Sequence, residues 1–326
     1  MMEVKSIGFF KELGKIFKIK EMGAIIGFVV IFIVFSILSS EFISWENLLS
    51  TFTMAAELGI VAIGITMLMI SGEFDLSVGS TFAVVPMVLA LSINNKINPF
   101  LGFIFGIFLG AFIGYLNGIT TLKTGIPSFI TTLGSMMFLR GILLAITGGF
   151  PIMLQEEIPF LRYFGGICIG GLRYSGIWFI ILAIIFAFIL ERTKFGNWTF
   201  ATGGNLLASK ALGINTDKVK LVNFIICSFM AGLAGITTFA RFKIIDPTLG
   251  QGMELEAIAS AVIGGTFLSG GYGSIIGTFL GAFMIGMVRS GLVLAGAPAY
   301  WYRAFIGIVL VIAAIINTKI RKRTAG

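Results

Sequence analysis

The chain of 326 residues contains no histidine and only two cysteines, Cys168 and Cys227. The commonest metal ligand and the commonest general base are therefore both missing. Cys227 falls inside a long apolar run and Cys168 in a predicted loop, so we expect no disulfide between them. The sequence has no GxxxxGK[ST] and no GxSxG motif. These absences argue against a metalloenzyme, a serine hydrolase and a nucleotide-binding chain, and they predict no catalytic residue, metal or cofactor on this chain.

Charged side chains are also scarce. They make up 12% of the residues, about half the share in soluble domains, whereas 57% of the residues are hydrophobic. Apolar runs of about 20 residues, long enough to cross a bilayer, recur along the chain. The sequence predicts an all-α integral membrane protein with ten spans: 22–40, 51–70, 78–93, 100–122, 127–147, 175–190, 221–240, 257–270, 273–295 and 301–317. The span 257–270 is short and rich in glycine, which predicts a broken or re-entrant element.

The net charge of +8 is concentrated in short segments between the apolar runs. Lysine and arginine favour cytoplasmic loops, so this pattern predicts both termini in the cytoplasm and argues against a nucleic-acid partner. We expect a cytoplasmic, amphipathic segment at 1–21, a membrane domain at 22–318 and a basic cytoplasmic tail at 319–326. The longest basic inner loop, 191–220, interrupts the membrane domain.

Two predicted spans carry stripes of glycine. In one span the glycines recur at every fourth position, and a second span repeats the spacing. Small residues let helix backbones approach closely in lipid, where little hydrophobic force acts between helices. The stripes therefore predict two helices buried in the bundle interior, with glycines at Gly102, Gly106, Gly110, Gly114 and Gly118, and at Gly273, Gly277 and Gly281.

Charged residues inside predicted spans are costly and are usually paired. Glu57, Arg140 and Arg289 lie at similar distances from the outer ends of their spans. We expect Glu57 to pair with one of the two arginines, and Glu254 or Glu256 are alternative partners for Arg289. Such a pair could hold helices together or gate a substrate.

Two asparagines also lie on apolar backgrounds within spans. Asn117 and Asn223 each carry an amide that can donate and accept hydrogen bonds. Each side chain could bind a sugar hydroxyl or a neighbouring helix, and the sequence leaves both uses open.

The inner loop 191–220 predicts a short exposed helix. Asn205 is a good N-cap and Gly213 a good C-terminal stop, so a two-turn helix is expected between them. Small residues such as Ala208 and Ser209 would let another protein approach closely. The helix therefore favours a docking site for a cytoplasmic partner, and the alternative is a surface turn without a partner.

Several stretches in order along the chain resemble one family. The segments 201–205 and 208–214 are similar to the coupling loop of the ribose/xylose-type permeases of bacterial, binding-protein-dependent ABC importers. Further stretches of this family are matched by Asp75–Ser80, Ile126–Gly134, Arg140–Gly141, Thr147–Gly149, Glu254–Ala259, Val262–Thr266 and Leu268–Gly271.

The resemblance implies a permease of the bacterial cytoplasmic (inner) membrane, with a ten-helix fold akin to the vitamin B12 importer class. A second permease copy, a cytoplasmic ABC ATPase that uses ATP and Mg, and an extracytoplasmic sugar-binding protein are the implied partners. The implied function is import of a small sugar, a monosaccharide.

Two sets of functional residues are expected, the first from the resemblance and the second mainly from charged and polar side chains in or next to the predicted spans. The ATPase-coupling set is Gly204, Asn205, Ala208, Ser209, Lys210 and Gly213. The residues expected on the translocation path or its gate are Glu57, Asp75, Asn117, Arg140, Asn223 and Arg289.

The sequence departs from the family at two places. Leu207 stands where relatives usually have glutamate, which removes one polar contact to the ATPase. The stretch 71–74 reads Ser-Gly-Glu-Phe in place of the common Gly-Gly-Ile, which fits a different substrate.

Other transport functions remain open. An ion-driven secondary transporter would need acidic groups or broken helices at the midplane. The same ABC machinery could also carry branched-chain amino acids or a sugar-like signalling molecule.

Overall fold

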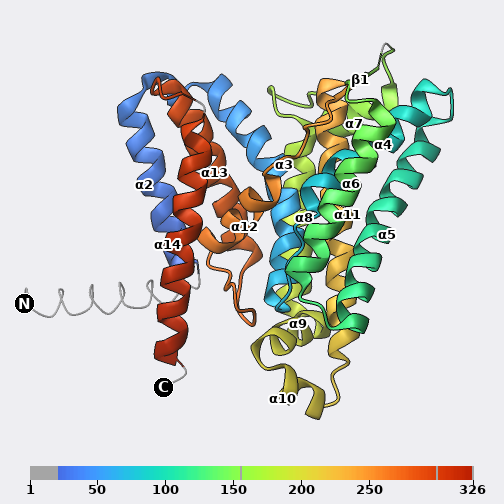
Figure 1. Ribbon diagram of the computed structural model, residues 1–326. Coiled ribbons are helices and arrows are strands. Elements are labelled where there is room, and N and C mark those ends of the chain that lie inside the picture. Colours follow the sequence, from blue (N-terminus) through green and yellow to red (C-terminus); the bar gives the residue numbers. More distant parts are fainter. Residues whose placement is uncertain (1–20, 155, 299, 325–326) are drawn as a thin grey trace, which may run out of the picture.

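The computed structural model describes residues 21–154, 156–298 and 300–324 and is mostly helical (Figure 1). The predicted amphipathic segment at residues 1–20 and the last two residues of the tail lie outside this description. The main helices are α2 (Met22–Leu38), α3 (Trp45–Ile70), α4 (Val78–Asn94), α5 (Pro99–Thr124), α6 (Ser128–Thr147), α8 (Tyr174–Arg192), α9 (Lys194–Gly204), α10 (Leu206–Ala211), α11 (Thr216–Phe242), α12 (Met253–Ile263), α13 (Ile275–Leu294) and α14 (Trp301–Thr324).

Each of the ten predicted spans overlaps one of these helices. Six of them, α3, α5, α6, α8, α11 and α13, are long and apolar enough to cross a membrane, and α2, α4 and the first half of α14 are shorter apolar helices. The structure differs most from the predicted spans at the ends of the helices. The helix α3 begins at Trp45, six residues before the predicted span, because Ser44 accepts a hydrogen bond from the Asn47 amide and caps it. The helix α14 continues to Thr324, through most of the predicted basic tail.

The helices form two groups with α3 and α12 between them (Figure 1). One group holds α2, α13 and α14, and the other holds α4, α5, α6, α8 and α11. The helix α3 contacts both α13 and α11, and 94% of its apolar window is buried. We call the end of the bundle that carries α9 and α10 the α10 end. The helix α2 begins and α14 ends at this same end (Figure 1).

Glycine mediates the closest helix contacts, but the two stripes differ. On α5, Gly114 lies so close to α11 that an added Cβ would stand 2.3 Å from the Phe224 carbonyl oxygen. Only this face of α5 is buried, since 28% of its apolar window is enclosed, against 67% for α13. The prediction of an interior helix is therefore right for α13 and wrong for α5, which lies at the periphery and buries one stripe.

The predicted interruption of the span 257–270 is confirmed. The helix α12 ends at Ile263, and a non-helical segment with glycines in the left-handed region follows it to Ser274. Gly264 and Gly277 pack α12 against α13, because an added Cβ on Gly277 would stand 1.9 Å from the Gly264 carbonyl oxygen.

The opposite end carries structure that the sequence did not predict. A two-stranded antiparallel sheet joins β1 (Ile152–Met153) to β2 (Ile244–Ile245). The segment after β1 contains the 3₁₀ helix η2 (Pro159–Leu161) and the short helix α7 (Arg162–Gly165), and a further 3₁₀ helix, η1 (Ser40–Ile43), joins α2 to α3. The helix α7 packs against the end of α11, where an added Cβ on Gly165 would stand 2.3 Å from the Arg241 nitrogen. Both cysteines are free in the structure, as expected.

Candidate functional site

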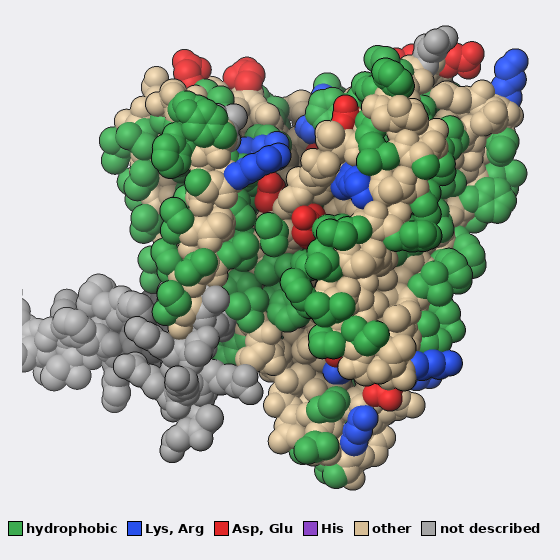
Figure 2. Space-filling model, viewed as in Figure 1, with side chains coloured by type: hydrophobic (Ala, Val, Ile, Leu, Met, Phe, Trp, Pro, Cys, Tyr) green, Lys and Arg blue, Asp and Glu red, His purple; other side chains and the backbone are tan. Residues whose placement is uncertain are grey.

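A cavity of about 550 Å³ lies between the two helix groups, on the face where Figure 2 shows basic and acidic side chains gathered in a hollow. Its walls come from α3, α4, α11, α12, α13 and α14 and from the loop before α12. Its polar and charged lining residues are Ser50, Glu57, Thr238, Arg241, Thr248, Gln251, Glu256, Arg289, Tyr302 and Arg303, and its apolar residues include Met54, Leu58, Phe82, Phe242, Leu249, Met253 and Ile285. A cavity of this size with hydrogen-bonding groups of both kinds can hold a small polar molecule.

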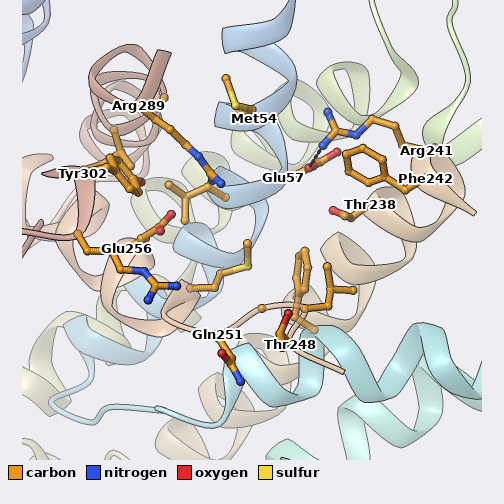
Figure 3. A pocket seen from close by; sticks show the side chains of 18 of the residues that line it. Met54, Glu57, Thr238, Arg241, Phe242, Thr248, Gln251, Glu256, Arg289 and Tyr302 are labelled. Carbon is orange, nitrogen blue, oxygen red and sulfur yellow. Dashed lines mark hydrogen bonds and ion pairs between the residues drawn. The ribbon is translucent and has the colours of Figure 1, made fainter. Parts of the chain in front are cut away.

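The predicted ion pair of Glu57 exists, but with a different partner. The Arg241 guanidinium donates to Glu57 Oε2 at 3.0 Å, and the two side chains are 17% and 8% exposed (Figure 3). Neither Arg140 nor Arg289 makes this contact. The predicted span 221–240 ends before Arg241, so the sequence alone does not place this residue beside Glu57. In the structure α11 continues to Phe242, and its packing against α3 brings Arg241 to Glu57.

Arg289 and Glu256 lie on the other side of the cavity from Glu57 and Arg241 (Figure 3). The Arg289 guanidinium lies 5.4 Å from the centre of the Tyr302 ring, within the range of a cation–π contact. Within the described residues, no carboxylate lies within 4.0 Å of Arg289. Its side chain is exposed, so it presents a positive charge to the contents of the cavity.

Arg140 serves the loop beside the cavity. Its guanidinium donates to the carbonyl oxygens of Pro247 at 2.8 Å and Leu249 at 2.9 Å. These carbonyls belong to the connection from β2 to α12, which also supplies Thr248 and Gln251 to the cavity wall. Arg140 therefore fixes the rim of the cavity and does not line it.

The predicted residues Asp75 and Asn117 meet in a separate polar group, nearer the α10 end. Asp75 accepts hydrogen bonds from the Ser77 amide at 2.8 Å, the Ser77 hydroxyl at 2.6 Å and the Ser228 hydroxyl at 3.0 Å. Asn117 donates to the Ser77 hydroxyl at 2.9 Å. All four residues are buried, and we call them the Asp75 cluster. It ties the start of α4 to α5 and α11. No sequence signal predicts Ser228 as a member of this cluster.

The loop before α4 is also bound to the helices around it. The Phe74 and Leu76 amides donate to the hydroxyls of Ser128 and Thr132 on α6, at 3.1 and 3.0 Å. Glu73, one of the family departures, forms an ion pair with Lys220 at 2.6 Å. These contacts hold the loop in place from several sides.

Asn223 lies apart from both regions. Its amide donates to the Thr199 hydroxyl of α9 at 3.4 Å, which fits the use of this residue in helix contacts. Asn223 therefore connects α11 to the inner loop and does not reach the cavity.

The inner loop contains the predicted short helix and a second helix that the sequence did not predict. Asn205 caps α10, with its side-chain oxygen accepting from the Ala208 amide at 3.0 Å, and Gly213 follows with φ +83°. The preceding segment, expected to be loop, is the helix α9. Leu207 and Leu212 are 80% and 81% exposed, so α10 presents apolar side chains at the α10 end of the bundle. Lys210 forms a solvent-exposed ion pair with Asp217 at 3.6 Å.

Comparison with known proteins agrees with this architecture. Residues 47–314 match the family described as the permease component of the branched-chain amino acid transport system. The chain is 33% identical to the ribose import permease protein RbsC of Escherichia coli, covering 92% of this chain and 94% of the relative. It is 35% identical to the xylose/arabinose import permease protein XylH of Sulfolobus acidocaldarius, covering 89% and 82%.

A third relative is the autoinducer 2 import system permease protein LsrC of Photorhabdus luminescens, 33% identical over 93% of this chain and 91% of the relative. No solved structure matches the chain at a significant level. The match to the family covers most of the chain, including the cavity walls and the inner loop. The chain therefore belongs to this family of ABC importer permeases.

Proposed function

We propose that this chain is the membrane-spanning subunit of an ABC importer that carries a monosaccharide across the cytoplasmic membrane. ATP hydrolysis, with its Mg²⁺, belongs in this proposal to a separate ATPase. The observation that carries it is the identity of 33% to a ribose import permease over 92% of the chain, together with a similar match to a xylose/arabinose permease.

The exposed helix α10 supports an ATPase partner. A helix capped by Asn205 with exposed Leu207 and Leu212 offers an apolar surface of the kind that docks into a groove of another protein. Basic residues in the same loop favour a cytoplasmic position. We assign α9 and α10 as the coupling segment, with contacts from Gly204, Asn205, Ala208, Lys210 and Gly213. The predicted contact residue Ser209 is buried and donates to the Asn205 carbonyl oxygen at 2.8 Å, so it supports the helix from within.

The open side of the cavity supports a second permease copy. Arg289 and Arg303 are exposed on this face, and Gln251 is exposed beside them. Charged and amide groups are costly to expose to acyl chains. A second copy of this chain, or of a close relative, would cover them and complete the passage. An extracytoplasmic binding protein would deliver the cargo to it.

The cavity has groups that suit a molecule rich in hydroxyls. Carboxylates accept, guanidinium groups donate, and Thr238, Thr248 and Tyr302 can do both. The same cavity holds charges of both signs, which a branched-chain amino acid also requires, and one relative carries autoinducer 2 in its name. These two cargoes are the competing candidates, and an ion-driven transporter is the competing mechanism.

The test is uptake into proteoliposomes that hold the purified permease and its ATPase, with the binding protein outside. Radiolabelled ribose, xylose and arabinose are compared with leucine and autoinducer 2, in the presence of ATP and Mg²⁺ or of a sodium or proton gradient. We expect uptake of one sugar with ATP alone. Uptake of leucine or autoinducer 2 instead of a sugar would show that the proposed cargo is wrong. Gradient-driven uptake without the ATPase would overturn the proposed mechanism.

A further inference from the structure

Three segments that are distant in the sequence meet at the α10 end of the bundle: the end of α3, the end of α9, and the loop between α12 and α13. The Gly271 amide donates to the Ile70 carbonyl oxygen at 2.8 Å, which joins the α12–α13 loop to α3. Gly203, near the end of α9, lies against both the donor nitrogen and the acceptor oxygen of this hydrogen bond. An added Cβ on Gly203 would stand 1.8 Å from the Ile70 oxygen and 2.7 Å from the Gly271 nitrogen.

The contact is made by backbone alone. Gly270 and Gly271 have φ of +80° and +77°, where other residues are strained. An added Cβ on Gly270 would stand 2.9 Å from the Gly72 Cα, and one on Gly271 would stand 2.5 Å from the Gly204 Cα. We call these five residues, Gly72, Gly203, Gly204, Gly270 and Gly271, the glycine junction. No side chain in it can change rotamer to absorb a displacement.

From the junction, close packing continues to the cavity. Immediately beyond the α12–α13 loop, Gly277 of α13 packs on Gly264. One turn further, an added Cβ on Gly281 would stand 2.0 Å from the Ser260 carbonyl oxygen. The helices α12 and α13 are thus held backbone to backbone along this length. The same two helices carry Glu256 and Arg289 on one side of the cavity.

On its other side, the junction joins the segment proposed to contact the ATPase. Gly204 ends α9 and Asn205 caps α10, so one residue separates the junction from the docking helix. The helix α3, whose end carries Ile70, also carries Glu57 on the opposite cavity wall. The cavity wall formed by α3 and the wall formed by α12 and α13 are thus joined at the Ile70–Gly271 hydrogen bond. A displacement of α9 acts on this hydrogen bond.

We infer that the glycine junction transmits movement of α9 and α10 to α3 and to the α12–α13 unit, which makes Gly203 and Gly271 positioning residues for transport. The inference rests on the proposed function, because it needs an ATPase that moves α10. Tightly packed groups transmit a displacement, whereas flexible side chains would absorb part of it. Neither glycine lines the cavity, so the role differs from contact with the cargo.

The test compares Gly203→Ala with Gly134→Ala in the complete reconstituted importer. Gly134 is also a helical glycine, and an added Cβ there meets no atom within 4 Å, so it is the matched control. We expect Gly203→Ala to lower the uptake per ATP hydrolysed at least tenfold. The amount of ATPase that copurifies should stay within twofold of the parent. The control should match the parent in both measurements.

Two results would overturn the inference: uptake per ATP within twofold of the parent, or loss of ATPase binding, which would make Gly203 a part of the docking surface only. Gly271→Ala approaches the same contact from the other side and should give the same uncoupling. If the parent itself shows no ATP-driven uptake, the proposed function fails and not the junction.

A second measurement needs no substitution in the junction. In the parent importer, we expect ATP and Mg²⁺ to change hydrogen–deuterium exchange of residues 264–274 at least twofold. Unchanged exchange in this segment, while uptake is driven by ATP, would overturn the inference even if both alanine variants fail to fold.

Discussion

The Asp75 cluster and the cavity are polar regions of one apolar bundle, and they differ in access to solvent. In the cluster, Asp75, Ser77, Asn117 and Ser228 are buried and bonded to one another. The cavity is open, and one of its charges, Arg289, is exposed to its contents. A closed polar group fixes the helices that it joins, whereas an open one remains available to a passing molecule. The comparison separates structural from transport roles, and it can be tested by substitution.

The largest loss of stability is expected where a partly buried charge loses its partner. Glu57→Ala leaves the Arg241 guanidinium, 17% exposed, without its carboxylate. We expect a cost of about 3 kcal/mol, because the remaining charge stays poorly solvated. Thermal unfolding in detergent measures it. The double variant Glu57→Ala/Arg241→Ala should be more stable than the single one, and equal stability of parent and Glu57→Ala would contradict the pairing.

The next effect concerns the Asp75 cluster. Asp75→Ala leaves the Ser77 amide and two serine hydroxyls without their acceptor, for an expected cost of about 2 kcal/mol. Asn117→Ala removes the amide that donates to the Ser77 hydroxyl between helices but leaves the carboxylate in place, and it should cost about 0.6 kcal/mol. The same unfolding assay ranks the two. A larger loss for Asn117→Ala than for Asp75→Ala would show that the carboxylate is not the centre of the cluster.

A third, smaller effect is local to the coupling segment. Asn205→Ala removes the N-cap of α10 and should destabilise this helix by about 1 kcal/mol. Hydrogen exchange of the α10 amides should become faster, while the unfolding temperature of the bundle stays the same. Asn205→Ser retains a capping oxygen and should restore slow exchange. Identical exchange in all three proteins would mean that the cap does not hold α10.

The smallest loss of stability is expected when Arg289 is replaced. This substitution tests the cavity half of the comparison with the Asp75 cluster. Arg289→Gln removes an exposed charge that has no carboxylate within 4.0 Å among the described residues. We expect a change in unfolding free energy below about 0.5 kcal/mol, as is usual for exposed side chains that are not part of a buried ion pair or a helix cap. Uptake should nevertheless fall several-fold. A large loss of stability without loss of uptake would assign Arg289 to the structural side of the comparison.

The sequence predicted the architecture well because apolar length and loop charge are local signals. Each predicted span overlaps a helix. The glycine content of 257–270 predicts the break after Ile263, and Asn205, a residue type that favours the N-cap position, predicts the start of α10. Predictions of ten complete crossings and of cytoplasmic termini rest on those same signals and stay predictions.

The partners of buried polar groups were predicted less well, because they depend on how distant helices rotate against each other. Arg241 is not an expected partner of Glu57, since the predicted span ends at residue 240, two residues before the end of α11 at Phe242. Ser228, the partner of Asp75, is 153 residues away and looks like any serine in an apolar helix. The helix α9 was missed because its sequence, rich in glycine and threonine, has weak helix propensity.

The backbone contact between Gly264 and Gly277 bears on how a mutational scan of this chain should be interpreted. The space there is filled by two peptide groups, and no side chain is intermediate in size between hydrogen and methyl. Every substitution at these positions meets the same collision, so a scan will score all nineteen replacements as equally harmful. Such a flat profile reports geometry alone. Graded profiles, in which similar residues are tolerated and dissimilar ones are not, will identify the positions that meet the cargo.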